Sequence, residues 1–571
     1  MTQPPPEGFG APYDPPSAPG YGYPPRQPGP YTQPGPYTQP FGPQPGHPYP
    51  AQPGYGYPAQ PGQGYPAQLP TVPMPGGPAG TGGGGGRLRG RTGMVVGAVL
   101  AVLLLAGGGV WLATGEGGDG KKPVAGPSGD GGERSASPTE DTEDGKDDDK
   151  GVAGPTAAEL DAGRKPGEAK VAWLAENGVD LPEYGEETHG PWFAGGIVAK
   201  GMYRKVTGYA ITGGAEKWSL RLPTDLCASP SAATADGKVV VGIEDNVSEK
   251  EASCSVLQMI DLRTGKAGWR KTVDRAAIQD GLSNVAMSIS GDTVTFGRNT
   301  ASNAFRVSDG EELFGRREGA CQPFAFTGGD RMIAAVTCQA EPSDPVRQQV
   351  QEVDPVTGAP KWTYELQPGW SVAHVYSVSP LVISVQQPEK STVVVLNDDG
   401  TYRSQMVGGA GGYGVRCGGE SVGTGGNLDG CAGVAADAER FYLSALPATG
   451  SGARTNAVVA FDLATGKSVW RSPAPAGRLL FPLRTEDGKV LVHLEALYRE
   501  GGEIGTLEPS TGTYATLLKH PASAAGTESS LFAPKVVYRD GRSCLLPRRI
   551  SLDEDEDEEE KAATAVLVFG E

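Results

Sequence analysis

The sequence lacks several motifs that mark common catalytic sites. Its 571 residues contain no HExxH zinc motif, no GxxxxGK[ST] phosphate loop and no CxxC pair. It has only five histidines, and no two of its seven cysteines are adjacent. These absences argue against metallopeptidases, P-loop NTPases and cysteine-ligated metal centres. We therefore expect no catalytic residue, no cofactor and no metal ion.

Basic residues are also scarce. The chain has 49 Lys and Arg against 67 Asp and Glu, which gives a formal net charge of −18. Binding to a phosphate backbone requires a basic face, so nucleic acid is not an expected partner. Helical periodicity is almost absent from residue 190 onward, where short apolar runs end at Gly-containing turns. This part of the chain is predicted to be all-β.

One short motif occurs three times in that region. It reads IDLRTGKAGWRKTV from Ile260, VDPVTGAPKWTYEL from Val353 and FDLATGKSVWRSPA from Phe461. Gly permits a tight turn between two strands, and a Trp at a fixed position predicts packing between neighbouring units. We therefore interpret the motif residues as structural: Asp261, Gly265, Trp269, Asp354, Gly358, Trp362, Asp462, Gly466 and Trp470.

Weaker copies extend the repeat. All the turn glycines together lie at 213, 265, 310, 358, 400, 466 and 512, separated by 42 to 66 residues. A period of this length with several strands per unit predicts a β-propeller, with seven blades as the first estimate. An eighth blade would form if residues 169–174 paired with residues 565–570, which would leave the ring without open edges.

The motif resembles the blade motif of pyrroloquinoline-quinone-like (PQQ-like) β-propellers over roughly residues 169–571. It is similar to the propeller of the outer-membrane barrel assembly lipoprotein and to extracytoplasmic propellers of membrane-anchored actinobacterial proteins. The resemblance implies a fold and says little about activity. Quinone-dependent dehydrogenases with such blades use a disulfide between adjacent cysteines and a calcium ion beside a catalytic Asp. This chain has no adjacent cysteines.

Four segments are expected. Residues 1–92 form a Pro/Gly/Tyr/Gln-rich tail, predicted to be disordered because it has too little apolar surface for a core. Residues 93–113 are predicted to be a transmembrane helix. Three arginines between residues 87 and 91 precede the span, which predicts a cytoplasmic N-terminus and an extracellular C-terminal domain. An acidic flexible linker, residues 114–168, then leads to the propeller domain, residues 169–571.

All seven cysteines follow the predicted span, as expected for an oxidising exterior. Pairing of neighbours in the sequence would give Cys227–Cys254, Cys321–Cys338 and Cys417–Cys431, but the sequence alone does not fix the connectivity. Cys544 would remain as a buried free thiol, or would pair between molecules.

Two unusual stretches are interpreted as loops. The Gly-rich residues 408–430 are predicted to be a flexible connection between blades. The acidic run Asp553–Glu560 is interpreted as a solvated loop, with a calcium site or a contact for a basic partner as alternatives.

Three functions agree with these features. The first is a single-pass membrane protein that displays its propeller as a non-catalytic platform for a protein or ligand outside the cell. The second is an envelope sensor that acts through a cytoplasmic partner, and the third is a quinone-dependent dehydrogenase. We expect the first, because it requires no residue that the chain lacks.

Overall fold

The computed structural model describes residues 154–571, except 249–251, 277–279, 408–411, 418–425, 448–453, 476 and 552–556. The predicted tail, the predicted membrane span and most of the predicted linker lie outside the described residues. Among the residues that are described, no helix is both long enough and apolar enough to cross a bilayer.

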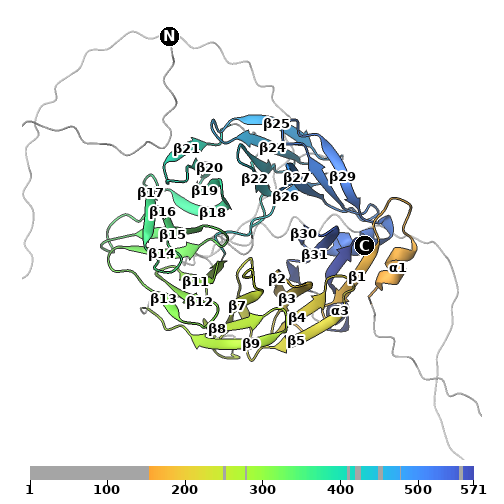
Figure 1. The fold of residues 1–571 in the computed structure, drawn as a ribbon, viewed down its shortest axis with the longest axis horizontal. Helices are drawn as coiled ribbons and strands as arrows, with labels where there is room; N and C mark the ends of the chain where they lie inside the picture. The colour runs from red at the N-terminus through yellow and green to blue at the C-terminus, as the bar shows by residue number, and fades with distance from the viewer. Residues whose placement is uncertain are drawn as a thin grey trace, which may run out of the picture. The chain divides into compact units, whose positions relative to one another are not determined.

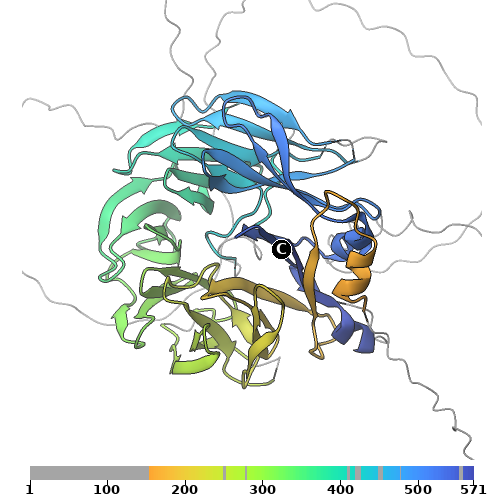
Figure 2. The same cartoon turned by 45° about the vertical axis from the view of Figure 1, so that its right-hand side comes forward.

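The described chain folds into eight antiparallel sheets that form a ring (Figures 1 and 2). Each sheet is one blade of a propeller, with its first strand near the ring axis and its fourth strand at the circumference. This confirms the all-β propeller and, of the two predicted blade numbers, selects eight.

The first four blades follow the chain order without interruption. Blade 1 contains β2 (Glu186–Ala194), β3 (Ile197–Met202), β4 (Lys205–Ala210) and β5 (Glu216–Arg221). Blade 2 contains β6 (Leu226–Ala228), β7 (Lys238–Glu244), β8 (Cys254–Asp261) and β9 (Lys266–Thr272). Blade 3 contains β10 (Ala286–Ser290), β11 (Thr293–Arg298), β12 (Ala301–Arg306) and β13 (Glu312–Phe314). Blade 4 contains β14 (Cys321–Phe326), β15 (Met332–Cys338), β16 (Arg347–Val353) and β17 (Pro360–Glu365).

The next three blades have the same topology. Blade 5 contains β18 (Ser371–Val378), β19 (Leu381–Gln387), β20 (Lys390–Leu396) and β21 (Tyr402–Gln405). Blade 6 contains β22 (Val434–Ala436), β23 (Arg440–Ser444), β24 (Ala457–Asp462) and β25 (Ser468–Pro473). Blade 7 contains β26 (Leu480–Glu486), β27 (Lys489–Leu494), β28 (Glu503–Leu507) and β29 (Tyr514–Lys519).

Blade 8 closes the ring by joining the two ends of the described chain. It contains β30 (Lys535–Arg539), β31 (Arg542–Leu546), β33 (Thr564–Phe569) and, as the outer strand, β1 (Val171–Glu176). The pairing of β1 with β33 is the closure that the sequence predicts. A short strand, β32 (Arg549–Ile550), leaves blade 8 and pairs with β2 of blade 1, which ties the two blades together a second time.

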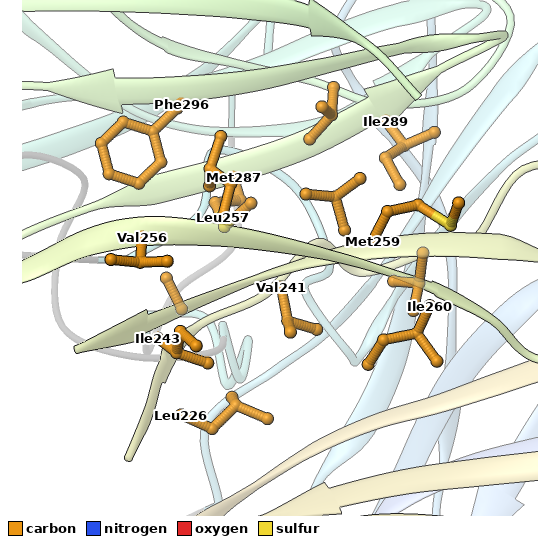
Figure 3. Packing of buried hydrophobic residues seen from close by; sticks show 14 of the residues in the cluster. Leu226, Val241, Ile243, Val256, Leu257, Met259, Ile260, Met287, Ile289 and Phe296 are labelled. Carbon is orange, nitrogen blue, oxygen red and sulfur yellow. The ribbon is translucent and has the colours of Figure 1, made fainter. Parts of the chain in front are cut away.

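Burial explains why the inner strands have no alternating pattern. Seven of the eight residues of β8 are buried, because both faces of the strand are covered by neighbouring blades. Figure 3 shows the apolar side chains of blades 2 and 3 that fill one such interface. The outer strand β9 instead alternates between exposed and half-buried residues. Most of the apolar surface is therefore buried between blades.

The Thr-Gly turns and the Trp side chains meet at these interfaces. Gly265 has a φ of 71°, and a Cβ on it would lie 2.5 Å from the ring of Trp218 in the preceding blade. The Trp218 ring nitrogen donates a hydrogen bond to the Leu262 carbonyl oxygen at 3.0 Å. Six interfaces have such an aromatic–glycine contact: Trp173–Gly214, Trp218–Gly265, Trp269–Gly310, Phe314–Gly358, Trp362–Gly400 and Trp470–Gly512. In blade 1 the contact uses Gly214 in place of the predicted Gly213.

Four short helical segments lie outside the sheets: α1 (Ala157–Ala162), η1 (Ala522–Ala524), α2 (Ala525–Ser530) and α3 (Asp557–Ala562). A capping box formed by Thr156 and Glu159 begins α1 within the last residues of the predicted linker. Leu160 of α1 is buried against Phe569 and η1 residues, so this part of the linker packs on the propeller. The helices η1 and α2 together fill the connection from blade 7 to blade 8.

Candidate functional site on the loop face

The two ends of the ring differ because the strands alternate in direction. Connections between first and second strands, and between third and fourth strands, meet at one end of every blade. This end carries the Thr-Gly turns, and we call it the turn face. The opposite end, the loop face, carries the second-to-third connections and the links between blades. The long connections belong to it, including residues 406–433, 520–534 and 547–563.

Three disulfides lie on the loop face. Cys227–Cys254 joins the starts of β6 and β8, Cys321–Cys338 joins opposed residues of β14 and β15, and Cys417–Cys431 lies within the link from blade 5 to blade 6. These are the three pairs that the sequence favours. Cys544 is a buried free thiol in the structure, and burial raises its pKa to about 12. The thiol is therefore unreactive.

Part of the link from blade 5 to blade 6 lies inside the ring (Figure 2). We call residues 427–429 the axial segment. Asn427 accepts a hydrogen bond from the Met287 backbone and donates to the Ser229 carbonyl oxygen. The Leu428 carbonyl oxygen accepts from the Val375 backbone at 2.8 Å, and the Leu428 side chain is fully buried. These partners belong to blades 2, 3 and 5, so the axial segment lies against the inner side of these blades.

Asp429 completes this arrangement. Its carboxylate accepts hydrogen bonds from the Ser231 hydroxyl at 2.8 Å and from the Gly328 backbone at 2.5 Å. Burial raises the pKa of Asp429, and the two hydrogen bonds oppose that shift. The sequence predicts a flexible connection here. In the described residues of the link, these hydrogen bonds and the Cys417–Cys431 disulfide fix the axial segment instead.

A possible metal-ligand group lies beside this disulfide. Among the described residues, a ligand atom of His374 and the sulfurs of Cys417 and Cys431 lie within 4.8 Å of one another. Both sulfurs are bonded to each other, whereas a metal ion requires free thiolates. The oxidised pair therefore does not form a metal site.

Two features deserve comparison with catalytic sites of hydrolases. Residues 419–423 spell GESVG, which matches the nucleophile-elbow pattern, and they lie outside the described residues. That elbow requires a strand before it and a helix after it, whereas the described residues on both sides form loop. Elsewhere, Ser229 Oγ lies 2.8 Å from His189 Nδ1. Burial, helped by the charge of Lys535, lowers the pKa of His189 to about 3, which makes it a poor general base.

A cavity of about 370 Å³ opens on the loop face between blades 7 and 8. We call it the 7/8 pocket. Its walls come from β27, α2, the residues that follow α2, and β31, and Arg416 reaches it from the blade 5–6 link. Arg416 pairs with Glu495 at 2.5 Å and stacks on Phe481. No sequence motif marks these residues as a site, because they meet only when the ring closes.

Three buried polar side chains lie at the base of this pocket. Glu528 accepts hydrogen bonds from His520 Nδ1 at 2.7 Å and from the Gly502 backbone at 2.9 Å. His493 Nε2 lies 3.9 Å from Glu528 Oε1, beyond hydrogen-bond distance. Burial opposes the ionisation of Glu528, but the neighbouring His520 and His493 outweigh this effect and lower its pKa to about 2. The carboxylate is therefore ionised at neutral pH.

A second cavity, of about 530 Å³, lies next to the first and shares the residues Ser530, Leu531 and Phe532 with it. Its other walls come from the start of the described chain, β32 and α3. Phe532 stands between the two cavities and is 64% exposed. Of the acidic run Asp553–Glu560, residues 553–556 lie outside the described residues, and residues 557–560 belong to α3 where the sequence predicts a loop.

The motif residues of the sequence analysis lie away from both cavities. Asp261, Asp354 and Asp462 accept hydrogen bonds from the backbone of their own turns on the turn face. Trp269, Trp362 and Trp470 pack on the next blade. The repeat therefore builds the ring, while the candidate site is made by residues outside the repeat, chiefly His493, Glu528 and Arg416. An isolated His or Glu has no spacing signal that could have identified them.

Comparison with known proteins agrees with the architecture. Residues 159–319, which include blades 1 to 3, match the family model described as outer membrane protein assembly factor BamB. This match supports the PQQ-like repeat assignment for that part of the chain. No curated protein matches the chain in sequence.

Solved structures of similar shape have low sequence identity to this chain. BamB from Moraxella catarrhalis is 14% identical, with 70% of this chain and 100% of that chain covered and a TM-score of 0.36. Quinohemoprotein alcohol dehydrogenase from Comamonas testosteroni is 14% identical, with coverage of 73% and 78% and a TM-score of 0.42. The Neurospora crassa Pan2 WD40 domain is 10% identical, with coverage of 71% and 98% and a TM-score of 0.34. At these values the likeness does not extend to function.

The PQQ-like repeat raises the question of whether a quinone fits the ring axis. Asn427 and Leu428 bond to residues of blades 2, 3 and 5 on the inner side of the ring. The neighbouring disulfide joins cysteines that are 14 residues apart, unlike the adjacent cysteines that the resemblance implies for quinone enzymes. The residues present therefore do not fit a quinone at this position.

Proposed function

We propose that this chain is a single-pass membrane protein whose propeller lies outside the cell and serves as a non-catalytic binding platform. The loop face is its binding surface. The observation that carries this proposal is the asymmetry of the ring. The turn face repeats one structural motif, whereas the loop face carries the three disulfides and the long connections. Cavities occur on both faces, with volumes of about 440 and 330 Å³ on the turn face, so they do not distinguish the two.

Exposed aromatic residues support the choice of face. Tyr498 is 76% exposed in the connection between β27 and β28, and Phe532 is 64% exposed beside the two cavities. Large apolar side chains that stay exposed on a stable scaffold are typical of surfaces that a partner covers. The disulfides also agree with an oxidising location, where they would hold this surface in one conformation.

Site-specific photo-crosslinking in living cells tests the proposal. A photoreactive amino acid at Tyr498 or Phe532 should capture a partner of defined mass. The same amino acid at Val356, which is 55% exposed on the turn face, is the matched control. It should not capture the partner that the loop-face positions capture. Equal capture from both faces, or from neither, would reject the loop face as the binding surface.

The membrane topology needs a separate test. Protease added to intact cells should degrade the propeller and leave the N-terminal tail protected. Protection of the C-terminal region would place the propeller inside the cell and overturn this part of the proposal.

Two other functions make different predictions. An envelope sensor would require crosslinks from the N-terminal tail to a cytoplasmic partner that depend on occupancy of the loop face. A quinone-dependent dehydrogenase would oxidise alcohols or sugars when the purified chain is supplied with the quinone and calcium. Because no two cysteines of the chain are adjacent, we expect no such activity.

A further inference from the structure

Two cysteines and one histidine lie together where the link from blade 5 to blade 6 passes the inner strand of blade 5. A ring nitrogen of His374, on β18, and the sulfurs of Cys417 and Cys431 all lie within 4.8 Å of one another. In the described part of the chain, no other three His, Cys, Asp or Glu residues form such a group. Thiolate and imidazole are the usual ligands of zinc in proteins, so the set suits a metal ion once the disulfide is reduced.

His374 has the properties of a metal ligand. Burial lowers its pKa, and a hydrogen bond to the Asn427 backbone only partly opposes that shift. The neutral imidazole, which is the form that binds a metal ion, is therefore favoured at neutral pH. The Nδ1 atom is buried and has no hydrogen-bond partner among the described residues. A hydrogen bond from the ring to a backbone carbonyl is a common support of metal-binding histidines, because it fixes the orientation of the ring.

The site is closed while the disulfide is intact, because no open space leads to the buried Nδ1 atom. Zinc lies about 2.3 Å from each thiolate sulfur that binds it, so the ion takes the place of the S–S bond once the sulfurs separate. Cys417 and Cys431 are half-buried on the loop face and do not lie in the core. Metal entry therefore follows cleavage of the bond and requires no channel through the blades.

The backbone keeps the two cysteines close without their disulfide. Arg416 and Ala432 exchange two backbone hydrogen bonds, of 2.9 and 2.7 Å, directly beside the cysteines. The Cα atoms of Cys417 and Cys431 are 4.0 Å apart. His374 is fixed independently, because β18 is paired along its length with the next strand of blade 5. The three ligands therefore come from two segments that keep their own hydrogen bonds after reduction.

We propose that reduction of the Cys417–Cys431 disulfide creates a Zn²⁺ site formed by the two cysteines and His374. A dithiol supplies the two electrons, so the disulfide becomes two thiols and the dithiol becomes a disulfide. Zn²⁺ then forms two S–Zn bonds and one N–Zn bond, and the two thiol protons are released to water. The disulfide joins the link only to itself, whereas the metal ion joins the link to blade 5. This site goes beyond the proposed binding platform and does not depend on it.

Cobalt titration of the purified full chain tests this assignment. Co²⁺ substitutes for Zn²⁺, and its bonds to thiolates give a charge-transfer absorption band. The chain is reduced with a phosphine, separated from the reductant without oxygen, and titrated with Co²⁺. We expect the band to saturate at a single Co²⁺ per chain and to disappear when Zn²⁺ is added. The unreduced chain should give no band, and absence of the band from the reduced chain would overturn the proposal.

A pair of double variants locates the metal ion. Cys417→Ser combined with Cys431→Ser should remove the band. The matched control is Cys321→Ser combined with Cys338→Ser. That pair also has Cα atoms 4.0 Å apart, but within the described structure no third ligand completes it. The control should keep the band. A band that survives the first double variant, or that depends equally on both pairs, would overturn the assignment.

A histidine variant separates a built site from metal binding by a chain that reduction has unfolded. His374→Gln should weaken Co²⁺ binding by about tenfold or more, because the ion loses one of its three protein ligands. In an unfolded chain, the loss of one histidine out of five would change the affinity little. The thermal midpoint of the reduced parent chain should also rise with Zn²⁺, and that of His374→Gln should rise less. Equal affinities of the parent chain and His374→Gln would overturn the site.

Discussion

The turn face and the loop face of this ring are built by different rules. On the turn face, one arrangement recurs at six blade interfaces, where an aromatic ring lies against a turn glycine of the next blade. On the loop face, no connection repeats its neighbour, and this is where the disulfides and the 7/8 pocket lie. The difference teaches that the repeat specifies the ring and leaves the opposite face free to vary.

The two interfaces that lack the aromatic–glycine contact sharpen this comparison. Between blades 5 and 6, Ser404 Oγ donates to the Leu463 carbonyl oxygen, and the Val407 backbone donates to Gly466. Between blades 7 and 8, His520 stacks on Phe569 at 3.9 Å. Departures from the repeat thus coincide with the axial link and with the 7/8 pocket. The axial link and the 7/8 pocket each lie beside a blade interface that lacks the aromatic–glycine contact.

The largest stability effect is expected when an aromatic side chain is removed from a blade interface on the turn face. Trp269 packs on Gly310 and donates a hydrogen bond to the Val307 carbonyl oxygen at 2.7 Å. Trp269→Ala should lower the free energy of unfolding by about 4 kcal/mol, because it leaves a cavity and an unsatisfied carbonyl. The matched loop-face change, Tyr498→Ala, removes a side chain that is 76% exposed and should cost less than about 0.5 kcal/mol. Denaturant titration of both variants measures the difference, and similar losses would contradict the division between faces.

Removing a disulfide is expected to have the next largest effect. Cys321–Cys338 closes a loop with a sequence separation of 17 on the loop face. Replacing both cysteines by Ala should destabilise the folded state by about 3 kcal/mol, because the unfolded chain regains the entropy of that loop. The propeller should still form, since the inter-blade contacts of the turn face are untouched. Cys544→Ala is the control, because Cys544 is not part of a disulfide. The thermal midpoint of Cys544→Ala should fall less than that of the variant without Cys321 and Cys338.

Acid should weaken the loop face at the blade 7–8 interface. The pKa of Glu528 is about 2 in the folded state, below its ordinary value of 4.5, so its contribution to stability is complete above pH 4.5 and is lost as the pH falls toward 2. The loss should reach about 2–3 kcal/mol relative to Glu528→Gln, which cannot titrate. Unfolding measured for both chains across this pH range gives the difference. If the difference in unfolding free energy between the two chains stayed constant with pH, the Glu528 carboxylate would not stabilise the interface.

How much of the fold and of the candidate site the sequence predicts depends on how far apart the contacting residues lie along the chain. The turn at Gly265 and the packing of Trp269 follow from one short window, and the closure of blade 8 follows from the need to cover free strand edges. The longest spacing, the 66 residues between Gly400 and Gly466, includes the axial segment, whose hydrogen-bond partners lie far away in the sequence and leave no local pattern. His493 and Glu528 meet because α2 folds back on β27, and no local pattern predicts that contact.

The smallest stability effect and the most direct functional effect should come from one exposed residue. Phe532 is 64% exposed and borders both loop-face cavities, so Phe532→Ser should change the free energy of unfolding by less than about 0.5 kcal/mol. If the loop face binds the partner, the same substitution should reduce photo-crosslinking from Tyr498 several-fold, because an exposed aromatic side chain is a typical anchor. Val356→Ser on the turn face is the control, since it removes a comparably exposed apolar side chain and should leave capture unchanged. A stable Phe532→Ser variant with full capture would mean that the asymmetry of the ring concerns its construction and not its binding.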